Sequence, residues 1–101
     1  MEKALQIREW LLDKKGLDIV IMVPEHDILV DKFMIVTAGS VNQIAALAEH
    51  LKEKCRGQYF RMDGEPESEW VVADLSNILV HIFSERMRRI YNLEELGKEI
   101  E

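Results

Sequence analysis

Side chains that could do chemistry are concentrated in one segment of the chain, residues 70–96, with the sequence WVVADLSNILVHIFSERMRRIYNLEEL. Within it, His81 interrupts an apolar run, and the pair Arg88-Arg89 lies close to Tyr91. Histidine serves as a general base or a metal ligand, whereas Arg and aromatic side chains are frequent anchors of protein interfaces. The residue types alone therefore permit either catalysis or binding.

Nucleophilic catalysis is poorly supported by the spacing of these residues. The types needed for a catalytic triad are available from Asp74, His81 and one of three serines, Ser40, Ser76 and Ser84. No GxSxG elbow surrounds any of these serines, and a chain of this length offers such trios by chance. We therefore expect no catalytic residue here.

Metal-binding residue types are also too scattered. His26, His50 and His81 do not fall at the spacing of a metal motif, and the single cysteine, Cys55, has no partner ligand nearby in sequence. We expect no bound metal and no cofactor.

The segment Thr37-Ala38-Gly39-Ser40 precedes a predicted helix and is the remaining candidate for anion binding. It contains neither GxxxxGK[ST] nor GxGxxG. A Gly-Ser opening a helix also occurs in nucleotidyltransferases, but those enzymes hold Mg²⁺ with two nearby carboxylates, and Asp74 stands alone. A divergent nucleotidyltransferase-like enzyme or nucleotide-binding domain that uses Ser40 stays open as an alternative.

Strand periodicity predicts where His81 lies. It shares one face of a predicted strand with Leu79 and Phe83, while Val80 and Ile82 point the other way. Two interpretations remain: a neutral histidine bonded to a backbone or carboxylate group within the sheet face, or a polar residue that a partner protein covers. Trp70 is likewise either a core residue or an interface anchor.

The elements that must position these residues follow from periodicity and capping. A helix is predicted over 2–15, and strands over 18–23 and 33–37 should be antiparallel neighbours joined by a turn at 24–27 and a short connector at 28–30. Ser40 and Gln43 form a capping box for a helix that runs to about residue 54. A loop with a short edge strand at 59–62 follows.

The segment 70–96 itself is predicted as a hairpin and two helices. Strands over 70–75 and 78–83 are joined through Ser76-Asn77, Ser84 caps a helix over 85–91, and Asn92 with Glu95 starts another. Helices and strands are mixed without strict alternation. We therefore expect an α/β fold, a single domain over 1–101 with helices packed on a mixed β-sheet.

Composition limits the class of protein. The chain has 101 residues, 48% of them hydrophobic, and a net charge of -6, which disfavours a general nucleic-acid binder and suits a basic protein partner. No apolar run approaches the ~20 residues that a membrane-spanning helix needs. One cysteine fits a reducing compartment, so a cytoplasmic location is expected.

The pattern of the chain resembles the ribosomal silencing factor family, RsfS, also called Iojap. The C-terminal half carries the family's run of apolar, acidic and aromatic positions at Trp70, Asp74, His81, Phe83, Glu85, Arg88, Tyr91, Leu93 and Glu94. The N-terminal half matches at Lys14, Lys15, Asp18, Ile19, Asp31, Phe33–Val36, Thr37 and Ser40. The resemblance covers about residues 4 to 97. Gly97 replaces a common Trp, and Lys32 replaces an aromatic residue.

The resemblance implies a nucleotidyltransferase-like fold without catalytic carboxylates. It also implies binding to protein number fourteen of the large ribosomal subunit, where the factor would block joining of the small subunit and repress translation when nutrients are short. No catalysis is implied. A separate hypothesis is a homodimer in which a face or an edge of the sheet forms the interface between the two copies. We expect the contact on the hairpin and the helix after it, through Trp70, Asp74, Asn77, His81, Arg88 and Tyr91.

Overall fold

A mixed β-sheet forms the centre of the molecule. The computed structural model describes residues 1–25 and 30–101. Its strands are β1 (Leu17–Pro24), β2 (Lys32–Ala38), β3 (Arg61–Asp63), β4 (Trp70–Asp74), β5 (Ile78–Ser84) and β6 (Gly97–Glu99). They form a 6-stranded sheet in the order β3-β4-β5-β2-β1-β6, in which β2 and β5 are parallel and the other neighbours antiparallel. The predicted mixed sheet and the antiparallel pairing of its first two strands are confirmed.

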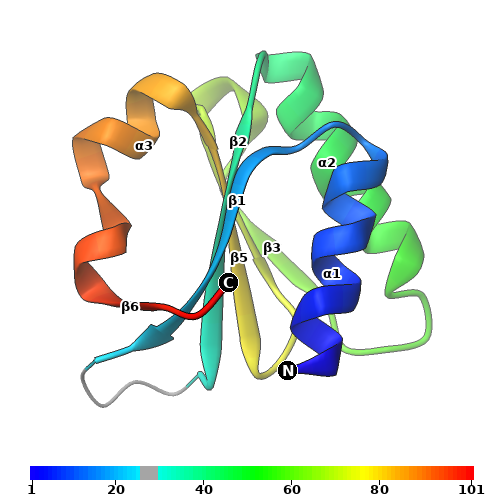
Figure 1. Ribbon diagram of the computed structural model, residues 1–101. Coiled ribbons are helices and arrows are strands. Elements are labelled where there is room, and N and C mark those ends of the chain that lie inside the picture. Colours follow the sequence, from blue (N-terminus) through cyan, green and yellow to red (C-terminus); the bar gives the residue numbers. More distant parts are fainter. Residues whose placement is uncertain (26–29) are drawn as a thin grey trace.

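Helices cover both faces of this sheet (Figure 1). Helices α1 (Glu2–Asp13) and α2 (Val41–Lys54) lie on one side, and α3 (Glu85–Tyr91) lies on the other. Two short 3-10 helices, η1 (Pro66–Ser68) and η2 (Leu93–Leu96), precede β4 and follow α3. Among the described residues, no helix combines the length and apolar character needed to cross a membrane.

Capping residues fix where α2 and α3 begin, as the sequence predicts. The Ser40 hydroxyl accepts a hydrogen bond from the Gln43 backbone N–H at 3.0 Å, and Ser84 does the same for Met87 at 3.2 Å. Each bond satisfies an N–H group that has no partner within its helix. The side chain of Gln43 returns to the backbone N–H of Gly39, one residue before the cap.

The sheet separates two apolar cores. Alternate residues of the central strands, such as Val36, Val80 and Ile82, pack under α1 and α2. The intervening residues, among them Ile35 and Phe83, pack on the side that carries α3. This alternation follows from the two-residue period of a strand and confirms that His81 lies opposite Val80 and Ile82.

The C-terminal segment differs from its prediction. Asn92 adopts a left-handed conformation with φ 46°, makes no side-chain cap, and is followed by a 3-10 helix rather than a second α-helix. The chain then returns as β6 beside β1, a strand that periodicity did not predict. Gly97 begins β6, and a Cβ there would lie 2.5 Å from the Val23 carbonyl oxygen and 3.0 Å from Phe33 Cε1. Backbone proximity therefore accounts for a glycine at this position.

The predicted edge strand is β3, shifted to residues 61–63. Residues 26–29 lie outside the described part of the chain, and with them His26 and most of the predicted turn and connector between the first two strands.

Candidate functional site

An aromatic cluster lies on the side of the sheet that carries α3. Trp70 on β4 is paired with Phe83 on β5, and His81 on β5 is paired with Ile35 on β2. The Trp70 ring centroid lies 4.9 Å from that of Phe83 and 4.5 Å from that of Tyr91, which belongs to α3. Parallel and antiparallel pairing together bring these residues onto one face, so the hairpin and α3 share one surface.

Trp70 and His81 are joined by a hydrogen bond. The indole Nε1–H of Trp70 donates to Nδ1 of His81 at 3.2 Å. Because indole nitrogen only donates, Nδ1 must be the acceptor, and the proton of the neutral imidazole lies on Nε2. Burial lowers the pKa of His81 to about 4, so the ring is neutral at physiological pH. The partner is thus an indole, rather than the backbone or carboxylate group expected from the sequence.

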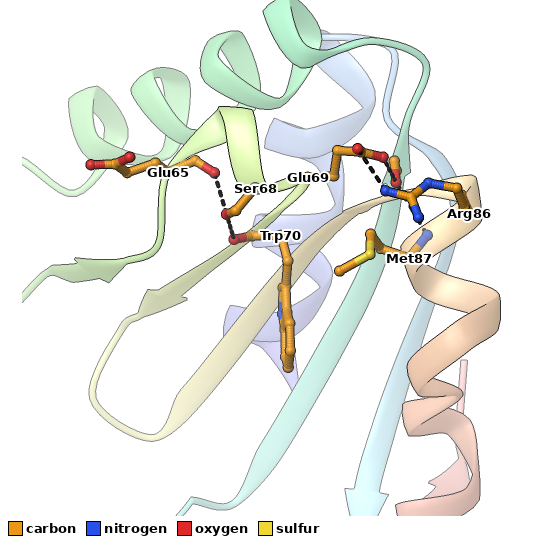
Figure 2. Close-up of polar contacts among 7 residues, drawn as sticks. Glu65, Ser68, Glu69, Trp70, Arg86 and Met87 are labelled. Carbon is orange, nitrogen blue, oxygen red and sulfur yellow. Dashed lines mark hydrogen bonds and ion pairs between the residues drawn. The ribbon is translucent and has the colours of Figure 1, made fainter.

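Hydrogen bonds of Ser68 hold the backbone at the start of β4, where Trp70 lies (Figure 2). The Ser68 hydroxyl lies 2.7 Å from the Glu65 carbonyl oxygen and 3.3 Å from that of Trp70. Figure 2 shows the indole lying against the sheet, with Met87 of α3 beside it.

Glu69 links the same strand to α3. Its carboxylate accepts hydrogen bonds from Ser84 Oγ and Arg86 Nη2, both at 2.8 Å, and the pair with Arg86 is the first cause of its lowered pKa. The Ser84 hydroxyl therefore caps α3 and donates to Glu69 at once, which connects the residue preceding β4 to the start of α3.

An apolar groove of about 280 Å³ opens beside the Trp70–His81 pair. It is lined by Val30, Phe33, Trp70, Leu79, His81, Leu93 and Leu96. Among these lining residues, the polar side-chain atoms are the two ring nitrogens of His81 and the indole nitrogen of Trp70. We call this cavity the His81 groove. A groove of this kind suits an apolar group of a partner better than a charged substrate.

Arg88 fastens α3 and η2 to the sheet. Its Nη1 donates to the Asp18 carbonyl oxygen at 2.6 Å and to Thr37 Oγ1 at 2.9 Å, and its Nε donates to Glu94 at 2.9 Å. The side chain is only 12% exposed. Arg88 thus holds one wall of the groove in place and presents little of its own surface to a partner.

Asp74 and Asn77 lie at the hairpin turn, at the end of β4 and β5 remote from α3. The Asp74 carboxylate accepts from the Ser76 backbone N–H at 3.0 Å and from the Tyr59 hydroxyl at 3.3 Å. The carbonyl oxygen of Asn77 accepts from the Asp31 N–H at 2.9 Å, which connects the turn to the start of β2. The predicted residues therefore form three groups: Trp70, His81 and Tyr91 in the cluster, Arg88 beneath α3, and the two turn residues.

Sequence reasoning missed the apolar lining of the groove. Leu93 and Leu96 are spaced like one face of a helical turn, which was a usable signal. Val30 and Phe33 reach the groove because β2 pairs with β5, and this pairing had no local signal in the sequence.

The described residues offer little support for a catalytic arrangement. The Ser40 hydroxyl is occupied as a helix cap, and Nδ1 of His81 is occupied by Trp70 rather than by a carboxylate. A depression of about 300 Å³ at the start of α2 includes Glu69, whose carboxylate is held by Ser84 and Arg86. Over residues 1–25 and 30–101, no group of three or more His, Cys, Asp or Glu side chains is placed to hold a metal ion.

Comparisons with known proteins identify the family. A family model described as "Ribosomal silencing factor during starvation", RsfS, matches residues 1–101. The ribosomal silencing factor RsfS of Bacillus subtilis is 36% identical over 88 residues, which cover 83% of this chain and 75% of that protein.

Two solved structures share the fold. A protein of Chromobacterium violaceum superposes with a TM-score of 0.84 at 29% identity, covering 95% of this chain and 83% of that one. A protein of Bacillus halodurans gives a TM-score of 0.80 at 31% identity, covering 100% and 99%. With the family model matching its whole length, the chain belongs to the RsfS family of ribosomal silencing factors.

Proposed function

We propose that this protein binds the large ribosomal subunit at its protein number fourteen and sterically blocks joining of the small subunit. Translation would thereby be repressed in the cytoplasm under nutrient limitation. Membership of the RsfS family supports the ribosomal role. The observation that carries the choice of surface is the His81 groove with the aromatic pair Trp70 and Tyr91 beside it.

The proposed contact surface is exposed where binding needs it. Tyr91 is 48% exposed although its ring packs against that of Trp70, and Leu96 at the groove is 51% exposed. Aromatic side chains that are already held in place lose little conformational freedom on binding, which favours them as anchors. Asp74 and Asn77 extend the surface to the hairpin turn, and Arg88 contributes by holding α3 in position.

Size and charge agree with a role as a steric block. An ordinary stable interface buries roughly 800 Å² on each partner. The accessible surface of the protein is 6085 Å², so one face of the sheet suffices and the remainder is free to obstruct a second subunit. The net charge of -6 favours encounter with a basic ribosomal protein. We propose no catalytic step, because obstruction requires only affinity and bulk.

Co-sedimentation with isolated large subunits, followed by a subunit-joining assay, tests the function. The protein should sediment with large subunits and reduce the formation of joined ribosomes. Sedimentation without any effect on joining would refute the block and leave ribosome binding standing. Failure of the wild-type protein to sediment would refute both.

A matched pair of variants tests the surface. Tyr91→Ala removes an exposed anchor of the proposed face and should weaken sedimentation at least tenfold. Leu12→Ala is the control, because Leu12 is 49% exposed on α1, on the opposite side of the sheet. Two further variants, Asp74→Lys and His81→Ala, should also weaken binding. If both stay folded and bind like the wild type, the proposed placement of the contact is wrong.

A further inference from the structure

His81 offers a hydrogen-bond donor to the apolar groove. Since Nδ1 accepts from the Trp70 indole at 3.2 Å, the proton of the neutral ring is held on Nε2. Within residues 1–25 and 30–101, no hydrogen bond to Nε2 is formed, and the His81 ring lines the groove. The Trp70 contact therefore leaves His81 with one defined donor that a ligand in the groove can reach.

The surroundings of this donor define what it can bind. The groove of about 280 Å³ is otherwise built from aliphatic and aromatic side chains. Covering an N–H group in such a place costs free energy unless an acceptor enters with the apolar group that covers it. The occupant must therefore carry an apolar group and a hydrogen-bond acceptor side by side.

Charge selects the acceptor. Burial keeps His81 neutral, with a pKa of about 4, so it provides no positive charge for a phosphate. The chain carries a net charge of -6, and the guanidinium of Arg88, which binds Glu94 of η2, is also engaged by Asp18 and Thr37. Both facts disfavour RNA phosphate and favour an uncharged carbonyl oxygen from a protein.

We propose that Nε2–H of His81 donates a hydrogen bond to a carbonyl oxygen of the ribosomal partner protein, next to an apolar partner side chain that fills the His81 groove. This inference rests on the proposed function and specifies the chemistry of its contact. Trp70 acts here as a positioning residue, because its N–H selects the tautomer that donates. His81 then serves recognition as well as structure, and it requires no change of charge to do so.

Two isosteric variants separate the roles of the two ring nitrogens. In His81→Asn, the side-chain oxygen replaces Nδ1 and still accepts from Trp70, but nothing replaces the Nε2 donor. In His81→Gln, the amide nitrogen replaces Nε2 and restores the donor, while the acceptor for Trp70 is displaced. The dissociation constant for isolated large subunits is measured for the wild type and both variants, with thermal unfolding to confirm that each is folded.

The expected loss of affinity is about tenfold for His81→Asn, because the partner's carbonyl oxygen is then covered without a hydrogen-bond donor. For His81→Gln, which restores the donor, the expected loss is less than about threefold. Equal binding by the wild type and His81→Asn would overturn the proposal, since the donor would then be unused. Equal losses in both folded variants would also overturn it, because the ring shape alone would matter.

Two further outcomes distinguish a failure of the His81 contact from a failure of the proposed large-subunit binding. Wild-type protein that does not bind large subunits refutes the proposed function, and the inference with it. Light scattering tests whether a second copy of the chain, rather than the ribosomal protein, occupies the groove. If His81→Asn converts a dimer to a monomer and leaves subunit binding unchanged, the groove is a self-interface, and the assignment of the carbonyl to the ribosome is wrong.

Discussion

The guanidinium of Arg88 and the hydroxyl of Thr37 meet at 2.9 Å, although 51 residues separate them in the chain. The same Nη1 also donates to the Asp18 carbonyl oxygen at 2.6 Å. One side chain therefore ties α3 to β1 and β2. Arg88 also binds Glu94 of η2, which supplies Leu93 and Leu96 to the His81 groove, so these contacts link the stability of the fold to the shape of the surface we assign to binding.

Replacing Arg88 should lower stability substantially. Arg88→Ala leaves the buried Thr37 hydroxyl and the Asp18 carbonyl without their donor, which should cost about 2–3 kcal/mol in the free energy of unfolding. Arg89→Ala is the matched control, because its contact with Glu85 spans 3.9 Å and its side chain is 74% exposed, so the cost should be below about 0.5 kcal/mol. Urea unfolding of both variants measures the difference, and equal costs would show that the Arg88 contacts add nothing.

The buried His81 should make stability depend on pH. The pKa of His81 is about 4 in the folded protein and near the ordinary histidine value of 6.5 when the chain is unfolded. Above pH 6.5 neither state binds the proton, whereas between 6.5 and 4 only the unfolded state does. The free energy of unfolding should therefore fall as the pH is lowered through this window, by at most about 3 kcal/mol.

Comparison with His81→Asn isolates this effect, because other titrating groups are common to both proteins. Unfolding is measured in denaturant between pH 7.5 and pH 4.5. The wild type should lose more stability than the variant over this range. Parallel curves would mean that His81 titrates alike in the folded and unfolded states.

The double role of Ser84 gives a prediction with two readouts. Ser84→Ala removes the cap of α3 and a donor to Glu69, so it should destabilise the protein by about 1–2 kcal/mol. The pKa of Glu69 should also rise, since the Ser84 hydrogen bond is one cause of its lowering. Carboxyl titration followed by NMR measures this rise. Ser84→Thr keeps the hydroxyl and should restore both properties, and a Thr variant that behaves like Ala would contradict the capping role.

Gly97 should tolerate no side chain without movement of β6. In Gly97→Ala, the new Cβ would lie 2.5 Å from the Val23 carbonyl oxygen, so the pairing of β6 with β1 must shift. The expected loss is about 1–3 kcal/mol. Lys98→Ala, at the next and exposed position, should stay within about 0.5 kcal/mol of the wild type. Hydrogen exchange should be faster in β6 for Gly97→Ala alone, and unchanged exchange there would show that the strand accommodates the methyl group.

The sequence by itself determined the elements whose signals are local. Alternation placed His81 on the face of Leu79 and Phe83, and the Ser40 and Ser84 caps located the starts of α2 and α3. Such signals suffice because a strand's period and a helix's unpaired N–H groups act over a few residues. The residue types also singled out Trp70, His81 and Tyr91, but the sequence left open whether Trp70 and His81 serve the core or an interface.

Only the tertiary structure decided what those side chains contact. The parallel pairing of β2 with β5 brought Phe33 to His81, and the return of the chain as β6 depends on an approach of backbone to backbone at Gly97. The indole partner of His81, and hence the nitrogen that carries its proton, follows from the register of β4 on β5. Contacts between distant segments are set by packing of the whole chain, and no pattern within one segment encodes them.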